Sequence, residues 1–100
     1  MPLYALIGKD KPNGVAHRMA VRPEHLKHLD RLGPMLVFAG AFETEGAEPT
    51  GTLCVIEAAN LTEAQDLFAR DPYITRGVFG SYEVTRWKWS INNPEGRGQG

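Results

Sequence analysis

Four short stretches of the chain carry the alternating, β-branched and aromatic residues that are typical of β-strands. They predict strands over Leu3–Gly8, Met35–Phe42, Thr52–Glu57 and Tyr82–Trp89. The second and third of these stretches are apolar on both faces. The segment between them, Glu43–Gly51, is acidic and contains glycine and proline, which is typical of a loop.

Two amphipathic segments between the strands predict helices. Pro23 is favoured at the first position of a helix and Gly33-Pro34 ends one, so we expect a helix over Glu24–Leu32. A second helix begins at a capping box at Thr62. It ends near Asp71, because the residue before a proline disfavours α-helical geometry.

The resulting order, βαββαβ, predicts a ferredoxin-like α+β sandwich, with a four-stranded antiparallel sheet and two helices on one of its faces. We expect one domain over residues 1–91. The tail over residues 92–100 has three glycines and a proline, and we expect it to be disordered. Because the second and third strands are apolar on both faces, the side of the sheet opposite the helices would be hydrophobic and uncovered. We therefore expect a homodimer that pairs through this side of the sheet.

The composition of the chain restricts the classes of partner that we expect it to bind. The 100 residues are 42% hydrophobic and 23% charged with a formal net charge of −1, which argues against nucleic acid or a membrane as the main partner. The single cysteine, Cys54, makes no internal disulfide and builds no zinc site alone. With no signal peptide or membrane span in the sequence, we expect a cytoplasmic protein.

Two residues stand out chemically. His25 falls on the apolar stripe of the first predicted helix, and Asp71 lies at the unfavourable C-terminal end of the second. His25 could be a buried imidazole satisfied by a backbone carbonyl, and Asp71 could cap a turn beginning at Pro72. Chain direction also brings the start of the first helix and the end of the second to one edge. A His–Asp dyad that fixes the tautomer of a general acid or base is therefore allowed.

Other polar residues ring the same edge. Arg18 and Arg22 are suited to holding a carboxylate or enolate, and Tyr73 follows Asp-Pro, so these three are candidate substrate-binding residues. We expect His28 to be a solvated flank residue. The spacing of His17, His25 and His28 matches no strong ligand motif, so we expect no metal and no other cofactor.

Five segments together resemble the YciI-like (YCII-related) family: Arg18–Leu26, Ala39-Gly40, Thr50–Thr52, Asp71–Tyr73 and Gly77–Phe79. The resemblance implies a dimeric α+β barrel of ferredoxin-like protomers and a proposed His–Asp pair in a cleft, which maps onto His25 and Asp71. One branch of the family resembles an enzyme that removes chloride from a chlorinated hydroxyhydroquinone. The family often has Tyr in place of Phe79 and a longer loop than Glu43–Gly51, and both departures bear on the substrate.

Three functional hypotheses follow. The first is a small enzyme in which His25, oriented by Asp71, moves a proton in an elimination or isomerisation of a small hydroxylated or aromatic molecule. The second is a non-catalytic, ligand-binding or accessory homodimer in which the dyad is only a polar anchor. The third is a haem- or quinol-handling monooxygenase, since other dimeric α+β barrels do such work.

Overall fold

The computed structural model describes residues 1–99 as an antiparallel sheet with helices packed on one side. The elements in chain order are β1 (Leu3–Asp10), α1 (Val15–Leu32), a 3-10 turn (Gly33–Met35), β2 (Leu36–Glu43), β3 (Pro49–Glu57), α2 (Leu61–Phe68), α3 (Pro72–Thr75) and β4 (Phe79–Trp87). The predicted strands differ from these bounds by no more than three residues at either end.

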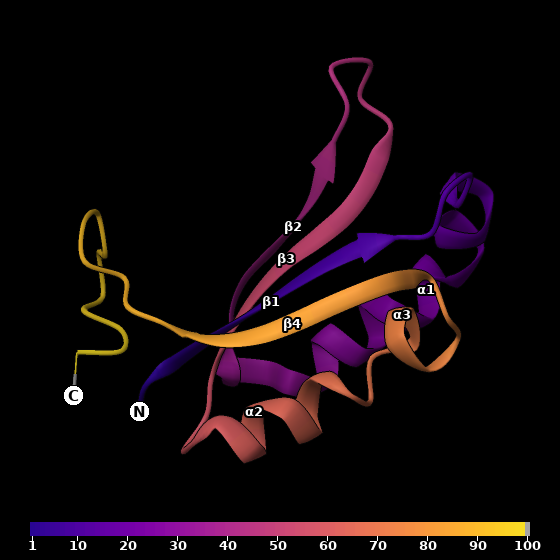
Figure 1. The fold of residues 1–100 in the computed structure, drawn as a ribbon. Helices are drawn as coiled ribbons and strands as arrows, with labels where there is room; N and C mark the ends of the chain where they lie inside the picture. The colour runs from indigo at the N-terminus through magenta and orange to yellow at the C-terminus, as the bar shows by residue number, and fades with distance from the viewer. Residues whose placement is uncertain (100) are drawn as a thin grey trace.

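All neighbouring strands are antiparallel, in the order β2-β3-β1-β4. All three helices lie on the same side of this sheet, and the other side is uncovered (Figure 1). The predicted ferredoxin-like α+β fold is therefore confirmed. No helix among residues 1–99 combines the length and the apolar character that crossing a bilayer requires.

The start of the first helix was predicted wrongly. α1 begins at Val15 and runs for 18 residues with Pro23 in its interior, so Pro23 does not open the helix. An internal proline lacks the N–H that would bond the preceding turn. That turn is instead held against the sheet by two buried side chains, Arg18 and Val21. The consequence for the site is that His25 lies in the middle of the helix.

The second predicted helix ends earlier than expected, at Phe68, and the short helix α3 follows it. α2 is capped by Asn60, whose side chain accepts a hydrogen bond from the backbone N–H of Glu63, so the predicted cap at Thr62 is wrong by two residues. Asp71 caps α3, because its carboxylate accepts the N–H of Tyr73, and the expectation that Asp71 caps a turn at Pro72 is confirmed.

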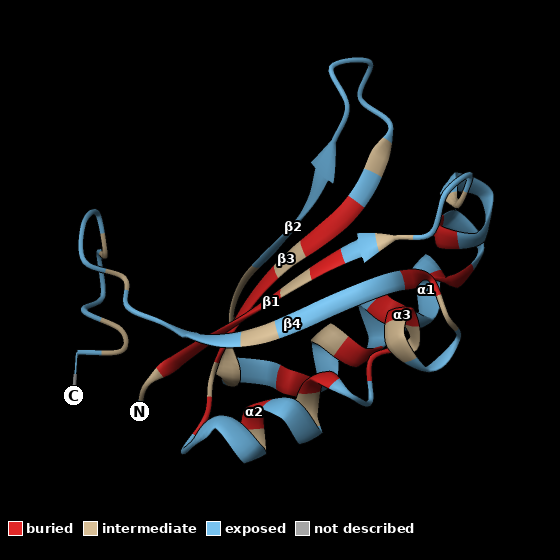
Figure 2. Ribbon diagram, viewed as in Figure 1, coloured by how far each residue is buried: buried red, intermediate tan, exposed pale blue. Residues whose placement is uncertain are grey.

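The core lies between the helices and the two central strands, and Figure 2 shows β1 and β3 as the most buried part of the sheet. Tyr4, Leu6 and Ile56 point toward the helices and pack with Phe68 and Tyr73. A second, smaller cluster lies on the uncovered face. It comprises Leu3, Ala5 and Val55, partly covered by Val37, Phe38, Leu53 and Trp89.

The segment after β4 folds back toward the end of the sheet. Arg97 pairs with Glu57 at 2.8 Å and donates to the carbonyl of Pro34 at 2.7 Å, and Gln99 donates to the carbonyl of Trp89. The predicted disorder of residues 92–100 stays a prediction, and residue 100 lies outside the described residues.

Gly8 gives a direct test of the packing between β1 and β4. A Cβ added at Gly8 would lie 2.6 Å from the buried ring of Phe79. We therefore expect Gly8→Ala to lower the free energy of unfolding by about 1–3 kcal/mol through overpacking. Gly46→Ala is the control, because a Cβ there meets only the Thr44 hydroxyl at an ordinary 3.7 Å. Equal melting temperatures for the two variants would contradict this packing.

Candidate functional site

The structure places His25 and Asp71 in direct contact. Nδ1 of His25 lies 2.9 Å from Oδ1 and 3.0 Å from Oδ2 of Asp71, and both side chains are almost fully buried. The partner of His25 is therefore a carboxylate and not a backbone carbonyl. An ionised carboxylate only accepts hydrogen bonds, so the proton of this bond sits on Nδ1. Nε2 of His25 is then the nitrogen left to take up or deliver a proton.

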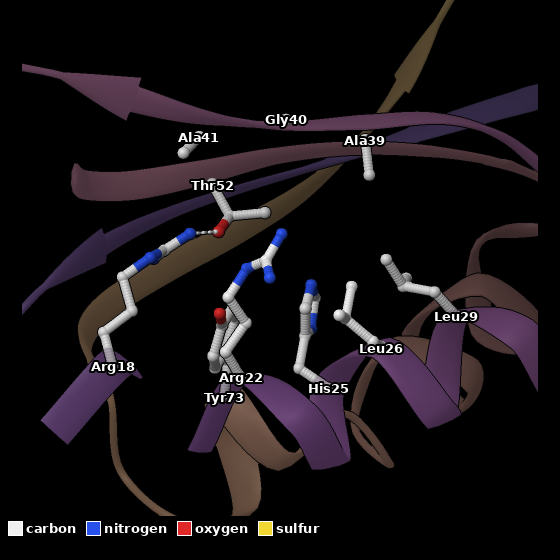
Figure 3. Close-up of a pocket in the computed structure, with 10 residues that line it drawn as sticks. All are labelled: Arg18, Arg22, His25, Leu26, Leu29, Ala39, Gly40, Ala41, Thr52 and Tyr73. Carbon is white, nitrogen blue, oxygen red and sulfur yellow. Dashed lines mark hydrogen bonds between the residues drawn. The ribbon is translucent and has the colours of Figure 1, made fainter. Parts of the chain in front are cut away.

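Nε2 points into a pocket. Figure 3 shows the outer nitrogen of the His25 ring directed away from α1, between the side chains of Arg22 and Leu26. Asp71 does not line this pocket and lies behind the imidazole. The arrangement separates a buried carboxylate, which orients the ring, from an outward nitrogen that a bound molecule can reach.

The pocket lies between α1 and the strands β2 and β3, and its volume is about 130 Å³. Its polar lining consists of Arg18, Arg22, His25, Thr52 and Tyr73. The remaining walls are small or aliphatic and consist of Leu26, Leu29, Ala39, Gly40 and Ala41. The pocket thus has one polar side and one apolar side (Figure 3).

Tyr73 contacts both members of the pair. Its ring stacks on the His25 ring with the centroids 3.9 Å apart and the planes 12° apart, while its backbone N–H donates to Asp71. Burial raises the pKa of the Tyr73 hydroxyl, and Arg18 and Arg22 only partly oppose that effect. The phenol therefore stays protonated near neutral pH and remains a hydrogen-bond donor.

Arg18 and Arg22 both line the pocket, but their surroundings differ. Arg18 is buried and bonds Asp10 and Thr52. Arg22 is exposed, and within residues 1–99 its guanidinium has neither an ion-pair nor a hydrogen-bond partner. Asp10 and Thr52 were missed by the sequence analysis. Thr52 falls in a segment that carries the family resemblance, whereas no sequence pattern singles out Asp10.

His28 was predicted wrongly as a solvated flank residue. It is only 5% exposed, and its Nε2 is buried with no hydrogen-bond partner among the described residues. Burial lowers the pKa of His28, and the nearby carboxylate of Asp71 only partly opposes that effect. His25 is therefore not alone in pointing inward from α1.

The metal-ligating side chains and the thiol do not gather into one cluster among residues 1–99. Residues 1–99 contain no group of three or more His, Cys, Asp or Glu side chains placed to hold a metal ion, and His17, His25 and His28 form none. Burial raises the pKa of the Cys54 thiol to about 12, so it stays protonated and unreactive near neutral pH.

Comparison with known proteins shows the family. The model of the YCII-related domain matches residues 2–88, so the chain belongs to the YCII-related family. An uncharacterized protein of Haemophilus influenzae is 33% identical over 93 residues, which cover 85% of this chain and 95% of that protein. The protein YciI of Escherichia coli O6:H1 is 30% identical over 94 residues, covering 86% of this chain and 96% of that protein.

Solved structures share the fold. A 5-chloro-2-hydroxyhydroquinone dehydrochlorinase from Burkholderia phenoliruptrix, in complex with 2,5-dihydroxybenzoquinone, is 26% identical with a TM-score of 0.80 and covers 91% of this chain and 98% of its own. An antibiotic biosynthesis monooxygenase is 14% identical with a TM-score of 0.55, covering 90% of this chain and 99% of its own. The second similarity shows the fold alone.

Titration of His28 gives a prediction for stability. Because the folded chain holds the pKa of His28 below its ordinary value of 6.5, the unfolded chain binds a proton there first as the pH falls. This group therefore makes the free energy of unfolding decrease as the pH drops below about 6.5. We expect His28→Leu to reduce that slope in urea unfolding measured between pH 7 and pH 5.

The control is His17→Gln, which removes an exposed imidazole from the same helix. An acid slope in His28→Leu as steep as in the unmodified protein would show that His28 does not titrate as its burial requires.

Proposed function

We propose that this protein is a small enzyme that uses His25 for general acid–base chemistry on a small hydroxylated or aromatic molecule, in a reaction of the lyase or isomerase type. The observation that carries the proposal is the buried bond between His25 Nδ1 and Asp71, which leaves Nε2 directed into a pocket with a cationic wall. The similarity in fold to a dehydrochlorinase supports the lyase type.

The pocket dimensions suit a single ring. A cavity of about 150 Å³ is known to hold one benzene molecule, and this pocket of about 130 Å³ is close to that size. Leu26, Leu29 and Ala39 would contact the apolar edge of a planar molecule. Its hydroxyl or enolate oxygens would then face Arg22 and His25.

In an elimination, Nε2 of His25 removes a proton from the substrate. The electron pair of the broken bond to hydrogen forms a double bond, and the leaving group departs with the electron pair of the bond that held it. Asp71 stabilises the imidazolium that forms, since the two are in contact. Arg22 stabilises the negative charge that develops on a substrate oxygen, because its guanidinium borders the same space. In an isomerisation, the same nitrogen returns the proton to another atom.

We also propose that two copies pair through the uncovered face of the sheet. Phe42 and Trp87 lie on that face and are 44% and 36% exposed. Phe38 packs edge-on against Trp87 and Trp89, which makes one continuous aromatic surface. An apolar surface of this kind is usually covered by a partner, and a second copy supplies the same surface.

The alternative function is a non-catalytic homodimer that binds a small molecule. The apolar sheet face is as consistent with this alternative as with an enzyme, because pairing of two copies does not require catalysis. Cys54 is a buried free thiol, which suits a reducing compartment, and we infer a cytoplasmic location.

His25→Asn separates the enzyme from the binding protein. The asparagine amide can still donate to Asp71 in place of Nδ1, but it supplies no base in place of Nε2. With 5-chloro-2-hydroxyhydroquinone as test substrate, we expect chloride release by the unmodified protein and about a 10²–10⁴-fold slower rate for the variant. We expect a stability loss of about 1 kcal/mol from the lost ring stack.

Binding of 2,5-dihydroxybenzoquinone, followed by its absorbance, is the matched measurement. Tight binding without chloride release by the unmodified protein would favour the non-catalytic alternative for this substrate. Equal rates for the unmodified protein and His25→Asn would overturn the role of His25.

Phe42→Glu tests the dimer. Light scattering of the unmodified protein should give twice the chain mass of 11.1 kDa, and a charge at the exposed Phe42 position should shift the population toward monomer. The control is Gln65→Glu, which adds the same charge at an exposed position of α2, away from the sheet face. Thr85→Glu would be unsuitable because Thr85 lies on the same face as Phe42. A monomeric unmodified protein at micromolar concentration would refute the dimer.

A further inference from the structure

The two arginines of the pocket are not equivalent. Nη1 of Arg18 bonds both carboxylate oxygens of Asp10, at 3.0 and 3.1 Å, and Nη2 bonds the Thr52 hydroxyl. Its side chain is 6% exposed and that of Asp10 is 5% exposed. The cation is therefore neutralised and held in place before any ligand arrives, and it is poorly suited to binding a second anion.

Arg18 also contacts Tyr73. The guanidinium carbon lies 4.6 Å from the centre of the Tyr73 ring, a distance that is typical of a cation–π contact. The other face of that ring is covered by His25 at 3.9 Å. Figure 3 shows the Tyr73 side chain between those of Arg18 and His25. The three planar groups thus form a stack with Tyr73 in the middle.

Helix geometry explains why the stack fits. Arg18 and His25 are seven residues apart, so they lie on the same face of α1, separated by two turns or about 10 Å along the axis. That spacing leaves room for one ring between them, and α3 inserts Tyr73 there. Both ends of the stack are fixed by buried carboxylates, Asp10 beyond Arg18 and Asp71 beside His25.

We propose that Arg18 is a positioning residue: held by Asp10 and Thr52, it presses Tyr73 against the His25 ring and keeps Nε2 aimed into the pocket. Arg22 is then the pocket's ligand-binding cation. This assignment rests on the proposed function, since it concerns the residue that moves the proton. The sequence predicted the same substrate-binding role for both arginines, whereas this proposal gives Arg18 a positioning role and Arg22 a ligand-binding role.

The test reads the His25 ring without any substrate. Long-range ¹⁵N–¹H spectra of the imidazole report its tautomer, and nuclear Overhauser contacts report the stack on Tyr73. The unmodified protein should show one tautomer with Nδ1 protonated, and strong contacts between the two rings. In Arg18→Lys, which keeps the charge beside Asp10 but has no planar face, we expect a loss of the ring contacts. A ring that turns away from Tyr73 also leaves its bond to Asp71, so we expect a mixture of tautomers.

A double variant, Asp10→Asn with Arg18→Met, repeats the test without leaving a buried carboxylate unpaired. Arg22→Met is the matched control. It removes an exposed cation from the same helix, and we expect it to leave the His25 spectrum unchanged while weakening binding of 2,5-dihydroxybenzoquinone at least tenfold. Arg18→Lys should weaken that binding less than Arg22→Met does.

Melting curves show which variants are folded. An unchanged His25 spectrum in folded Arg18→Lys would overturn the positioning role, as would an equal change in Arg22→Met. If the double variant does not fold, the result for Arg18→Lys decides. The spectrum is independent of turnover, so a protein with the expected ring behaviour but no activity would refute the proposed function and leave the stack intact.

Discussion

Burial of the Asp71 carboxylate imposes a constraint on the whole helical layer. Asp71 is 1% exposed, so its oxygens have lost water and depend on donors from the protein. Those donors are Nδ1 of His25 on α1 and the backbone N–H of Tyr73 on α3. Leaving either oxygen unpaired would cost about 1–3 kcal/mol or more. The requirement locks α1 to α3, and the same bond sets the tautomer of His25. Helix packing and the chemistry of the site therefore depend on one contact.

The site is assembled from distant parts of the chain around this contact. α1 supplies Arg18, Arg22 and His25, whereas α3 supplies Tyr73 and its N-cap supplies Asp71. β3 adds the Thr52 hydroxyl on the sheet side of the pocket. The β2 residues opposite α1 have small side chains, which leave the space that a ligand would occupy. The ferredoxin-like order brings these elements to one side of the sheet, and side-chain identity then decides what the pocket can do.

The strands and the cap at Asp71 could be predicted from the sequence, because strand alternation and the Asp-Pro pair depend only on neighbouring residues. The pairing of His25 with Asp71 followed from chain direction, although the helix start was misplaced at Pro23. The preference of proline for the first helical turn led to the wrong start. The preceding turn is helical because Arg18 and Val21 are buried against the sheet, which only the tertiary structure shows. Burial of His28 was missed for a related reason. Its position at the edge of the apolar stripe indicates exposure when α1 is considered alone, whereas in the folded chain α3 and its cap Asp71 pack close to it.

The measurement that tests the central claim most directly is a high-resolution crystal structure of the protein soaked with 2,5-dihydroxybenzoquinone. Our account predicts the ring in the pocket between α1 and β2, with one oxygen within hydrogen-bond distance of His25 Nε2 and another near Arg22. A ring bound elsewhere on the surface, with the space beside His25 closed by packed side chains, would contradict the account.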